Sequence, residues 1–337
     1  MNKLLSIIIP TYNMERFLRK CLDSLVLPDK QMEKLEILVI NDGSKDLSSS
    51  IGHEYESRYP QSIRVIDKDN GNYGSCINRG LKEASGKYVK ILDADDNFDT
   101  KQFGLFLNEI AHVEADMILC PFVSINEDGK VIKQFKIHIS PNKYSRINEV
   151  INSSTFRELQ MHSVTYLRKI LIDNKYNQSE GISYTDQEWI FTPIYYVQKI
   201  YVSQYGVYRY LLGREGQTMD PHVKIKSINH TSKGTIKMIK DYLKMDFSNR
   251  DDSFYKYRIN LRMGYLYKNY ILKNHNVLPA NDLIKFDSEI KDVSEKVYGW
   301  GNELNLLCGF LKYVKMWRTN PDSILLKLIR VTIGKFV

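Results

Sequence analysis

The sequence predicts an α/β fold, in which a mixed sheet flanked by helices is followed by a helical C-terminal region. Over the first hundred residues, short apolar runs alternate regularly with helical patterns, which is typical of βαβ units and a parallel sheet. Beyond them the alternation loosens, and from Pro221 onward helical patterns dominate. The chain has 337 residues, of which 43% are hydrophobic, and this length predicts about two domains.

The parallel part of the predicted sheet contains four strands with helices between them. The strands are expected at Leu4–Ile9, Leu35–Ile40, Ile63–Ile66 and Tyr88–Leu92. The helices are expected at Glu15–Leu27, Leu47–Tyr59 and Tyr73–Ala84. Because these strands are nearly continuous runs of Ile, Val and Leu, both faces of the sheet should be covered.

After Asp96 the sequence predicts an α+β half rather than further βαβ units. A helix near Gln102–Val113 precedes a strand at Asp116–Val123 and a turn at Asn126–Gly129, which should reverse the chain. The C-terminal helices should break near residues 249–252, 274–281 and 320–322. These patterns divide the chain into residues 1–100, 101–218 and 219–337.

The chain carries 48 Lys and Arg against 40 Asp and Glu, a formal net charge of +8 at pH 7. This excess favours anionic partners, and nucleic acid, anionic lipid and phosphorylated substrates all remain open. The four cysteines lie far apart with no CxxC pair, so we expect buried, reduced thiols. No run approaches the ~20 apolar residues of a membrane span, and the first apolar run is too short for a signal peptide. A cytoplasmic protein is therefore expected.

Polar clusters follow three of the predicted strands at the point where each strand ends. They are Pro10–Asn13, Asn41–Ser44 and Asp93–Asp96. In an open α/β sheet, ligands bind outside the carboxyl ends of the strands, so we expect the clusters to meet there. Each cluster taken singly is also ordinary turn or helix-capping chemistry. Their coincidence at one edge of one sheet predicts a binding site.

The cluster Asp93-Ala-Asp-Asp96 is the most informative, because three carboxylates directly follow buried apolar residues. Their mutual repulsion would be costly without a cation. Mg²⁺ and Mn²⁺ prefer carboxylate oxygens and commonly bind through one or two of them together with the phosphates of a substrate. The cluster therefore predicts a divalent cation and a nucleotide diphosphate. The alternative is that Asp96 or Asp99 caps the helix that begins near Thr100.

Two common phosphate-binding motifs are absent from the sequence. No G-x-G-x-x-G follows the first strand and no G-x-x-x-x-G-K-[ST] occurs, which disfavours a Rossmann dehydrogenase and a P-loop NTPase. Gly71, Gly74 and Gly80 follow the third strand without the dinucleotide spacing. We interpret this segment as a loop that lets the backbone approach a nucleotide closely, with a simple turn as the alternative.

These motifs resemble those of the family 2 glycosyltransferases, which have the GT-A fold. The resemblance rests on Ser6–Asn13, Leu38–Ser44, Asn78–Gly80 with Ala84–Tyr88, and Leu92–Asp96, in the family's order and spacing. These segments cover about the first third of the chain and are specific as a set. A weaker similarity extends through Ile182–Trp189 and Tyr208–Arg214. The resemblance implies a nucleotide-sugar-binding half at 1–100, an acceptor-binding half at 101–218 and a helical region at 219–337.

The resemblance also implies what the polar residues at the sheet edge do. The residues expected to bind the nucleotide are Pro10, Tyr12, Asp42, Asn70 and Asp93. Tyr12 would pack on the base, and Asp42 would hydrogen-bond the base or the ribose. Asp95, together with Asp93, would bind the Mn²⁺ or Mg²⁺ that bridges the diphosphate and neutralises charge as the leaving group departs. The expected donor is a UDP-sugar.

The family's acceptor-side loop often carries Glu-Asp where this chain has Thr185-Asp186, so the resemblance implies that Asp186 is the general base. It would take the proton from the acceptor hydroxyl while that oxygen attacks the anomeric carbon opposite the leaving diphosphate, so an α-linked donor would give a β-linked product. Glu188 is a rival base. A basic contact to the nucleotide is expected from Arg79 or Arg214, with a solvated surface arginine as the alternative for both.

The resemblance implies a saccharide acceptor, lipid-linked in our hypothesis, in the synthesis of bacterial surface polysaccharide. The segment Gly309–Val337 holds six basic residues against one acid, interleaved with apolar residues, which is the pattern of a basic amphipathic helix. We expect this helix to seat the protein on the anionic inner face of the cell membrane. The alternative is a helix that packs on the domain with its lysines solvated.

Two other functions compete with a transferase. A nucleic-acid partner is not expected, because no helix-turn-helix, zinc-finger or RNP motif occurs and the acidic clusters would repel phosphate without a metal. A non-catalytic nucleotide-sugar or saccharide-binding module on the same fold is the main alternative. The presence of Asp93, Asp95 and Asp186 together favours catalysis.

Overall fold

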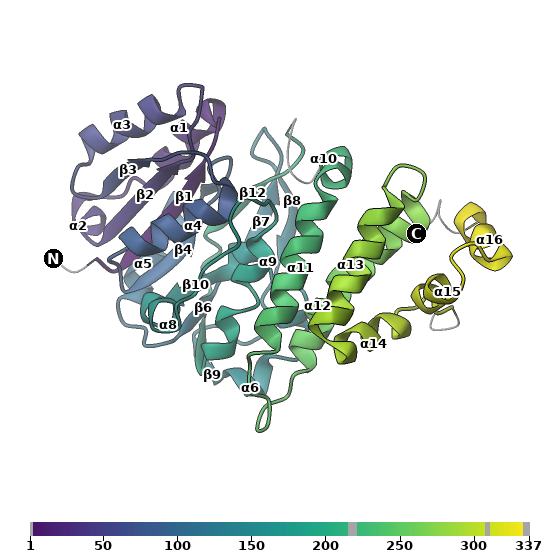
Figure 1. Ribbon diagram of the computed structural model, residues 1–337. Helices are drawn as coiled ribbons and strands as arrows, with labels where there is room; N and C mark the ends of the chain where they lie inside the picture. The colour runs from purple at the N-terminus through teal and green to yellow at the C-terminus, as the bar shows by residue number, and fades with distance from the viewer. Residues whose placement is uncertain (1–2, 215–220, 307–310, 333–337) are drawn as a thin grey trace. The chain divides into compact units, whose positions relative to one another are not determined.

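The main sheet lies in the first of two units, Met1–Gln217 and Thr218–Val337, of the computed structural model, which describes residues 3–214, 221–306 and 311–332 (Figure 1). Its strands, in spatial order, are β3 (Ile63–Asp67), β2 (Leu35–Asn41), β1 (Leu5–Thr11), β4 (Tyr88–Ile91), β10 (Val164–Leu167), β6 (Met117–Leu119), β11 (Lys199–Val202) and β9 (Lys143–Arg146). The sheet thus continues beyond the predicted βαβ units.

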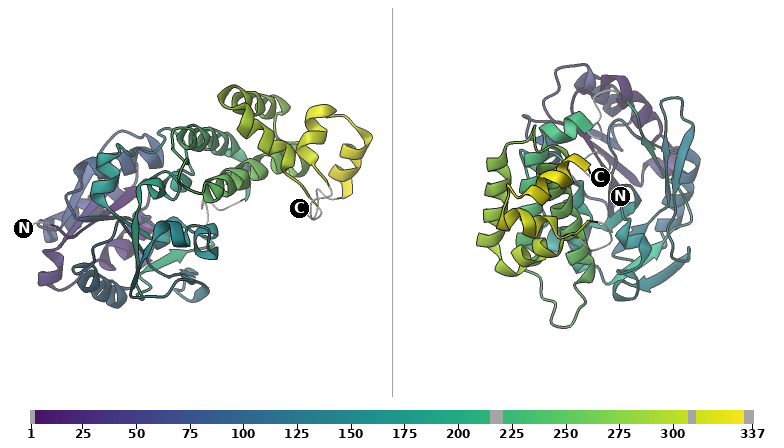
Figure 2. Two further views of the ribbon diagram at one scale, coloured as in Figure 1. Left: turned by 90° about the horizontal axis from the view of Figure 1, so that it is seen from below. Right: turned by 90° about the vertical axis from the view of Figure 1, so that its right-hand side faces the viewer.

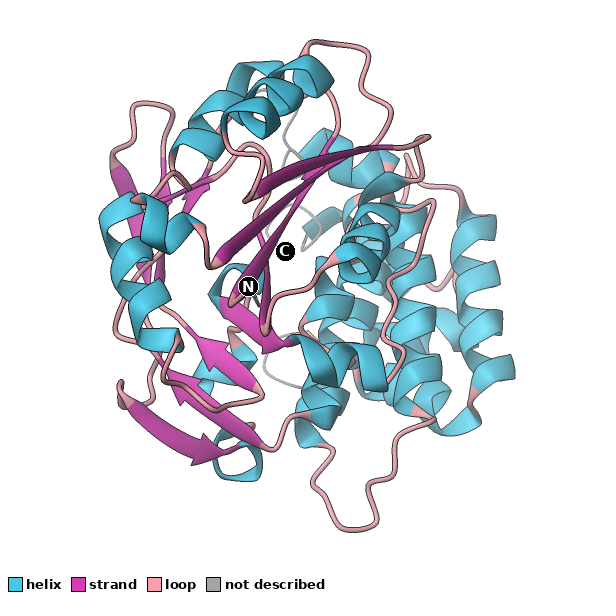
Figure 3. Ribbon diagram, turned by 90° about the vertical axis from the view of Figure 1, so that its left-hand side faces the viewer, coloured by secondary structure: helices cyan, strands magenta, loops and turns pink. Residues whose placement is uncertain are grey.

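Strands β1 to β4 are parallel, and their register fixes the edge at which they end. Thr11 of β1 lies opposite Asn41 of β2, and Ile8 of β1 lies opposite Ile91 of β4. The connecting helices are α1 (Glu15–Asp23), α2 (Asp29–Met32), α3 (Ser48–Arg58) and α4 (Asn72–Glu83). Figure 3 shows helices on both sides of the strands, as expected for strands that are apolar on both faces.

The sheet becomes mixed at β10, which is antiparallel to both β4 and β6. Strand β11 is parallel to β6, and β9 is antiparallel to β11. This arrangement confirms the predicted fold class, a mixed sheet flanked by helices. The other helices of the unit are α5 (Thr100–Ile110), α6 (Ile147–Val150), α7 (Ser154–Arg157), α8 (Arg168–Asp173), α9 (Asp186–Trp189) and the 3-10 helices η1 (Met161–Ser163) and η2 (Pro193–Tyr196).

The single strand predicted at Asp116–Val123 is wrong, because the segment divides between two sheets. Pro121 lies between β6 and β7 and has no N–H to donate, so a continuous ladder cannot pass through it. The second sheet has the order β5 (Asn97–Phe98), β12 (Tyr208–Leu211), β7 (Phe122–Ile125) and β8 (Val131–Phe135). The predicted turn at Asn126–Gly129 is confirmed: β7 and β8 are antiparallel, and Gly129 takes φ +79°.

The second unit is helical, as predicted. Its helices are α10 (Pro221–Lys226), α11 (Ile228–Tyr242), α12 (Ser253–Lys268), the π-helix η3 (Asn269–Lys273), α13 (Ala280–Val293), α14 (Glu295–Glu303), α15 (Tyr313–Thr319) and α16 (Ile324–Thr332). Figures 1 and 2 show α11, α12 and α13 side by side. The breaks predicted near 249–252 and 320–322 lie between helices, and the one near 274–281 does so except for its last two residues, which begin α13. A further break at Ser294 was not predicted; this residue is extended and its hydroxyl caps α14.

A buried arginine joins the helices of the second unit. Arg318 on α15 donates to Asp287 Oδ1 on α13 at 2.6 Å and to the Tyr298 carbonyl on α14 at 2.8 Å. Its guanidinium also stacks 3.5 Å from the centre of the Tyr298 ring. Gly301 leaves room for this group, because a Cβ there would lie 2.8 Å from Arg318 Nη2.

The single amphipathic helix expected from Gly309–Val337 is wrong, because the described part of the segment forms both α15 and α16. The chain is broken at Asn320-Pro321, where proline disfavours a helical residue before it. Residues 309–310 and 333–337 lie outside the described residues. On α16, Leu326 and Ile329 are buried, whereas Ile324 and Val331 are 79% and 70% exposed. None of the described helices is both long and apolar enough to cross a membrane.

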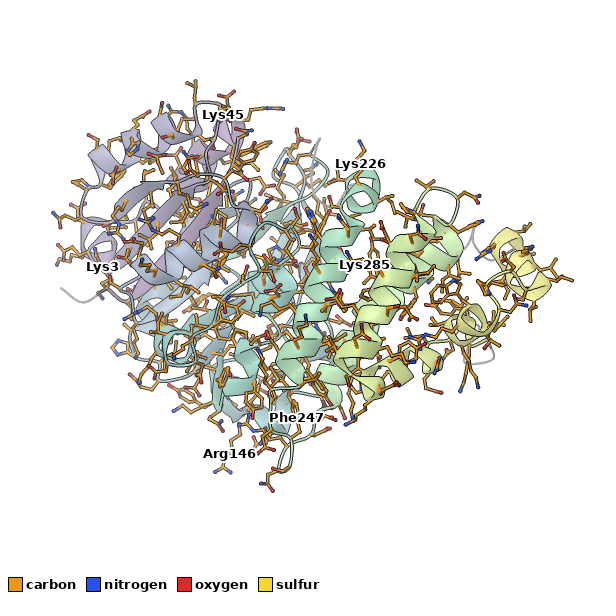
Figure 4. All side chains as sticks on the ribbon, viewed as in Figure 1. Lys3, Lys45, Arg146, Lys226, Phe247 and Lys285 are labelled. Carbon is orange, nitrogen blue, oxygen red and sulfur yellow. The ribbon has the colours of Figure 1, made fainter. Side chains whose placement is uncertain are left out.

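Exposed lysines carry much of the positive charge on both units. Lys45 and Lys285, both labelled in Figure 4, are exposed. Lys90, by contrast, is fully buried in β4. The expectation of buried thiols is confirmed for Cys21, Cys76 and Cys120, and Cys308 lies outside the described residues.

Candidate active site

The three polar clusters start from the same edge of the sheet. The Asp42 N–H donates to the Thr11 carbonyl at 2.8 Å, and the Leu92 N–H donates to the Ile8 carbonyl at 3.0 Å. The first two clusters are joined directly, since the Asn13 N–H donates to Ser44 Oγ at 3.0 Å. The parallel register of β1 with β2 and β4 therefore brings their polar ends together, as the sequence predicts.

Asp42 organises the loop between β3 and α4. Its buried Oδ1 accepts from Lys68 Nζ at 2.5 Å and from the Gly71 N–H at 2.9 Å. The Asn70 side-chain amide donates to the Asp42 carbonyl at 3.0 Å. Asp42 and Asn70 thus lie together, with Lys68 supplying the compensating charge. Tyr12, just after β1, is 47% exposed, so its ring is accessible to a ligand.

The interpretation of Gly71, Gly74 and Gly80 as a nucleotide-facing loop is wrong for the last two. Both lie inside α4, where they allow close packing within the protein. A Cβ on Gly80 would stand 2.5 Å from Ile8 Cγ2 on β1, and one on Gly74 would stand 2.0 Å from the Ser179 carbonyl oxygen. These glycines therefore fit α4 against the sheet and against the segment around Ser179.

The acidic loop after β4, Asp93–Asp96, is held by groups from β12. Tyr208 Oη donates to Asp96 Oδ2 at 2.6 Å and accepts from the Asp93 N–H at 3.1 Å. The Leu211 N–H donates to Asp96 Oδ1 at 2.7 Å. Asp96 is therefore a buried anchor of the loop. The capping alternative is confirmed only for Asp99, whose carboxylate accepts from the N–H of Gln102 in the first turn of α5.

Burial and mutual repulsion disturb the ionisation of this loop. Burial raises the pKa of Asp93 to about 7, and the charges of Asp95 and Asp186 add to the rise. Burial also raises the pKa of Asp96 well above its usual range, again with help from Asp95. Tyr73, in the first turn of α4, opposes the rise at Asp93 by donating to its Oδ1 at 2.7 Å. The loop is thus an electrostatically strained cluster of acids.

Asp95 points toward the arginine that the sequence suggested as a nucleotide contact. Arg214 Nε donates to Asp95 Oδ2 at 2.5 Å, and its guanidinium lies 5.4 Å from the centre of the Phe17 ring. Both side chains of this ion pair are largely buried. Arg79, the other suggested arginine, instead pairs with Glu83 one turn along α4. The structure therefore places Arg214, and not Arg79, at the acidic loop.

Asp186 begins α9 and ends the segment of residues 178–186, which we call the 178–186 loop. This loop is docked on α4: the Gly181 N–H donates to the Gly71 carbonyl at 2.9 Å, and Asn78 Nδ2 donates to the Gln178 carbonyl at 3.0 Å. The charge of Asp186 contributes to the raised pKa of Asp93, so the two carboxylates lie near enough to interact electrostatically. The rival base, Glu188, is buried and accepts from the Ser179 N–H at 2.9 Å.

His162 and Lys90 lie beneath the acidic loop. Lys90 Nζ donates to the carbonyls of His162, at 2.8 Å, and Val164, at 3.2 Å, and so ties β4 to η1. Burial lowers the pKa of Lys90 to about 8. Burial and the nearby Lys90 lower the pKa of His162 to about 3, so its imidazole is neutral.

The acidic loop fits a divalent cation by the chemistry of its donors. Asp93, Asp96 and His162 each offer a ligand atom, and these atoms lie within 4.8 Å of one another. Asp95 adds a carboxylate in the same loop. Carboxylate oxygens suit Mg²⁺ and Mn²⁺, and a positive charge would relieve the repulsion between these acids.

Sequence reasoning missed several residues that the structure places at this edge: Lys68, Tyr73, Lys90, His162 and Tyr208. Tyr208 lies in a segment with weak family similarity, which gives its position but not its contacts. Lys90 carried the clearest signal, because a lysine in an apolar strand requires buried acceptors. His162 is isolated in sequence from every motif, so only the folding of β10 beside β4 reveals it.

The comparison with known sequences identifies a family. Residues 6–173, about half of the chain, match the family described as Glycosyl transferase family 2. Over 127 residues the chain is 36% identical to the uncharacterized glycosyltransferase EpsJ of Bacillus subtilis strain 168. That match covers 38% of this chain and 36% of the relative, so the chain spans only about a third of the length of that curated protein.

Two solved structures share the fold over nearly the whole chain. The crystal structure of S. aureus TarS 1–349 in complex with UDP-GlcNAc has a TM-score of 0.68 at 17% identity, covering 98% of this chain and 92% of that chain. The mannosyltransferase PcManGT from Pyrobaculum calidifontis in complex with GDP-Man and Mn²⁺ has a TM-score of 0.53 at 12% identity, covering 99% and 88%. At these identities the likeness shows the fold alone. Together with the family match over residues 6–173, it leads to one assignment: the chain belongs to glycosyl transferase family 2.

Proposed function

We propose that the protein transfers a sugar from a nucleotide diphosphate donor to a saccharide hydroxyl, with Mn²⁺ or Mg²⁺ as cofactor. One observation carries this proposal: the folded chain brings Asp42, the Asp93–Asp96 loop and Asp186 to one edge of the sheet, although they come from three distant segments. A transferase needs these three elements to hold the nucleotide, to bind the cation that would compensate the charge of the diphosphate, and to accept a proton from the acceptor hydroxyl. Family membership supports the same reaction class.

The donor we propose is a UDP-sugar. The exposed ring of Tyr12 offers a face for the base, beside the end of β1 at Pro10. Asp42 and Asn70 offer polar groups for the base or the ribose, and Asp93 offers a carboxylate. TarS, whose fold is similar, has been crystallised with UDP-GlcNAc, which supports UDP as the nucleotide.

The cation would be held by carboxylates of the acidic loop, and we assign Asp93 and Asp95 to this task. When bound, the cation would compensate the negative charge that develops on the departing diphosphate. The complex of PcManGT with GDP-Man and Mn²⁺ supports such a cofactor on this fold. Because Arg214 pairs with Asp95, the loop keeps its acids partly compensated before any ligand arrives.

Asp186 is the general base in this proposal. Its carboxylate accepts the proton of the acceptor hydroxyl, whose oxygen forms a bond to the anomeric carbon. The bond between that carbon and the diphosphate oxygen breaks, and the nucleoside diphosphate leaves with the electron pair. A single displacement of this kind inverts the anomeric centre. The alternative base, Glu188, is less suitable because it is buried and holds the Ser179 N–H.

The test measures nucleotide binding and transfer separately. We expect UDP to bind in calorimetry only with Mn²⁺ or Mg²⁺, and to lose this binding in Asp95→Asn. Asp99→Asn is the matched control, because Asn also caps a helix and Asp99 caps α5. Asp186→Asn should bind UDP normally but transfer no sugar. Binding of neither UDP nor GDP would refute the proposal, and metal-dependent binding without turnover of any UDP-sugar would favour the binding-module alternative.

We further propose that α16 seats the protein on an anionic membrane surface, where a lipid-linked saccharide would be the acceptor for surface polysaccharide. Its exposed face carries Ile324, Leu325, Leu328 and Val331, and Lys327 lies beside them. An apolar face bordered by basic residues is suited to the interface of an anionic leaflet.

The membrane proposal is tested with sedimentation on phosphatidylglycerol vesicles. We expect wild-type protein to bind them and the double variant Leu328→Gln, Val331→Gln to bind much less. Ile284→Gln on α13 is the control, because Ile284 is a similarly exposed apolar residue elsewhere on the unit. Failure of the wild type to bind, or an equal loss in the control, would exclude α16 as a membrane anchor.

A further inference from the structure

The ring of His162 lies in a position that core packing alone does not explain. The residue is 7% exposed, and its Nδ1 has no hydrogen-bond partner among the described residues. Buried polar atoms in folded proteins are nearly always satisfied, so an unpaired ring nitrogen calls for a ligand or an ordered water. The ring is held by aromatic neighbours: Tyr210 stacks on it at 4.4 Å between centroids, and Phe122 and Tyr208 lie at 4.9 and 4.7 Å.

Two carboxylates lie close to the His162 ring. Ligand atoms of His162, Asp93 and Asp96 lie within 4.8 Å of one another, yet no hydrogen bond joins the imidazole to either acid in the described part of the chain. Such a spacing suits an atom that bridges all three groups. Metal–ligand bonds of about 2.1 Å place ligands across a cation about 4 Å apart, so only a small contraction is needed.

The backbone around His162 is held by a hydrogen bond from Lys90 and by its position next to β10. Lys90 Nζ donates to its carbonyl, and Ser163 and Val164 lead directly into β10. Asp96 is fixed as well, by Tyr208 and the Leu211 N–H. Two members of the set are thus rigidly placed, while Asp93 lies at the edge of the site where a diphosphate would approach. Rigid ligands at the correct spacing are what a selective metal site requires.

We propose that His162 supplies a nitrogen ligand, with Asp93 and Asp96, to the divalent cation of this protein, and that it biases the site toward Mn²⁺ over Mg²⁺. This inference rests on the proposed function, because it names further protein ligands for the same cofactor. Imidazole binds transition metals well, whereas Mg²⁺ strongly prefers oxygen. A set of acids without the histidine would discriminate less between the two ions.

The test uses Mn²⁺ itself as the probe, on the full chain. Electron spin echo modulation of bound Mn²⁺ should show coupling to ¹⁴N in the wild type and in His138→Phe, an exposed control histidine. His162→Phe, which keeps an aromatic ring in the pocket, should lose the coupling and bind Mn²⁺ at least about tenfold more weakly. Its affinity for Mg²⁺ should change much less.

The outcomes separate this inference from the proposed function. Bound Mn²⁺ without ¹⁴N coupling in the wild type would overturn the assignment of His162, whether or not the variant folds, and would leave water as the bridging group. If Mn²⁺-dependent UDP binding persists in that case, the transferase proposal stands. If neither Mn²⁺ nor UDP binds to the folded wild type, both proposals fail together.

Discussion

Replacing Tyr208 with phenylalanine should destabilise the first unit more than the loss of an ordinary buried hydroxyl. The Tyr208 hydroxyl donates to Asp96 and accepts from the Asp93 N–H, and the ring is fully buried. Its removal leaves two buried polar groups short of a partner, and each such group costs about 1–3 kcal/mol. We therefore expect a loss of about 2–6 kcal/mol in the free energy of unfolding, and weaker UDP binding in the presence of Mn²⁺.

The control is Tyr88→Phe in the same sheet. Tyr88 is equally buried; its hydroxyl donates to the Val113 carbonyl at 2.7 Å and accepts from the Ala115 N–H over a longer 3.5 Å. The Val113 carbonyl also accepts from Lys87 Nζ and stays satisfied, so Tyr88→Phe loses only the long bond from Ala115, and the expected loss is about 1 kcal/mol. Native-state hydrogen exchange, read by mass spectrometry, resolves peptides of β4 and β12 from those of the second unit. Equal protection losses in the two variants would show that the hydroxyl of Tyr208 does not hold the acidic loop.

Three further substitutions test other parts of the structure. Gly74→Ala would press a Cβ to 2.0 Å from the Ser179 carbonyl oxygen of the 178–186 loop, which carries Asp186. We therefore expect kcat to fall while the Kd for UDP changes little, and an unchanged kcat would contradict this packing. Gly301→Ala should lower the free energy of unfolding in urea by about 1–3 kcal/mol, because the new Cβ would meet Arg318. The loss should be smaller when Arg318→Ala is also present. If the losses of the two single variants simply add, the two residues are not in contact. Hydrogen bonding to Asp67 and a second carboxylate raises the pKa of His53. Protonated His53 therefore stabilises the fold, and this contribution is fully present below about pH 6.5. It amounts to at most about 1 kcal/mol, because the His53–Asp67 pair is exposed to solvent. The contribution is lost as the pH rises through the pKa that His53 has in the folded protein. His53→Gln should reduce the difference between the urea midpoints measured at about pH 6 and about pH 8. If the difference is unchanged, other groups cause the pH dependence of stability.

The parallel half of the fold could be predicted because its signals are local. Each apolar run that ends at Pro10, Asn41 or Asp93 predicts both a strand and the edge of the sheet at which that strand ends. The register of β1 with its neighbours then follows from ordinary βαβ geometry. For the same reason the sequence alone predicts that the three polar clusters meet.

The mixed half could not be predicted to the same extent, because its pairings are distant and its strands are short. Pro121 divides one apolar run between two sheets, which hydrophobicity does not reveal. Arg214 meets Asp95 across 119 residues of chain, and His162 approaches Asp93 only because β10 enters the sheet beside β4. The functional assignments of Asp93, Asp95 and Asp186 therefore remain predictions that the proposed experiments address.

The ties from β12 to the acidic loop also bear on how the protein is made. Asp93 and Asp96 are bonded to Tyr208 and Leu211, which are synthesised 112 to 115 residues later. During translation, the amino-terminal strands can assemble while these partners are still inside the ribosome or not yet added. The newly made loop therefore has the bond from Tyr73 to Asp93 available but lacks the ties to Asp96, and it acquires its final shape only after residue 211 has left the exit tunnel. Premature termination before β12 should accordingly yield a sheet that is formed but a loop that is not.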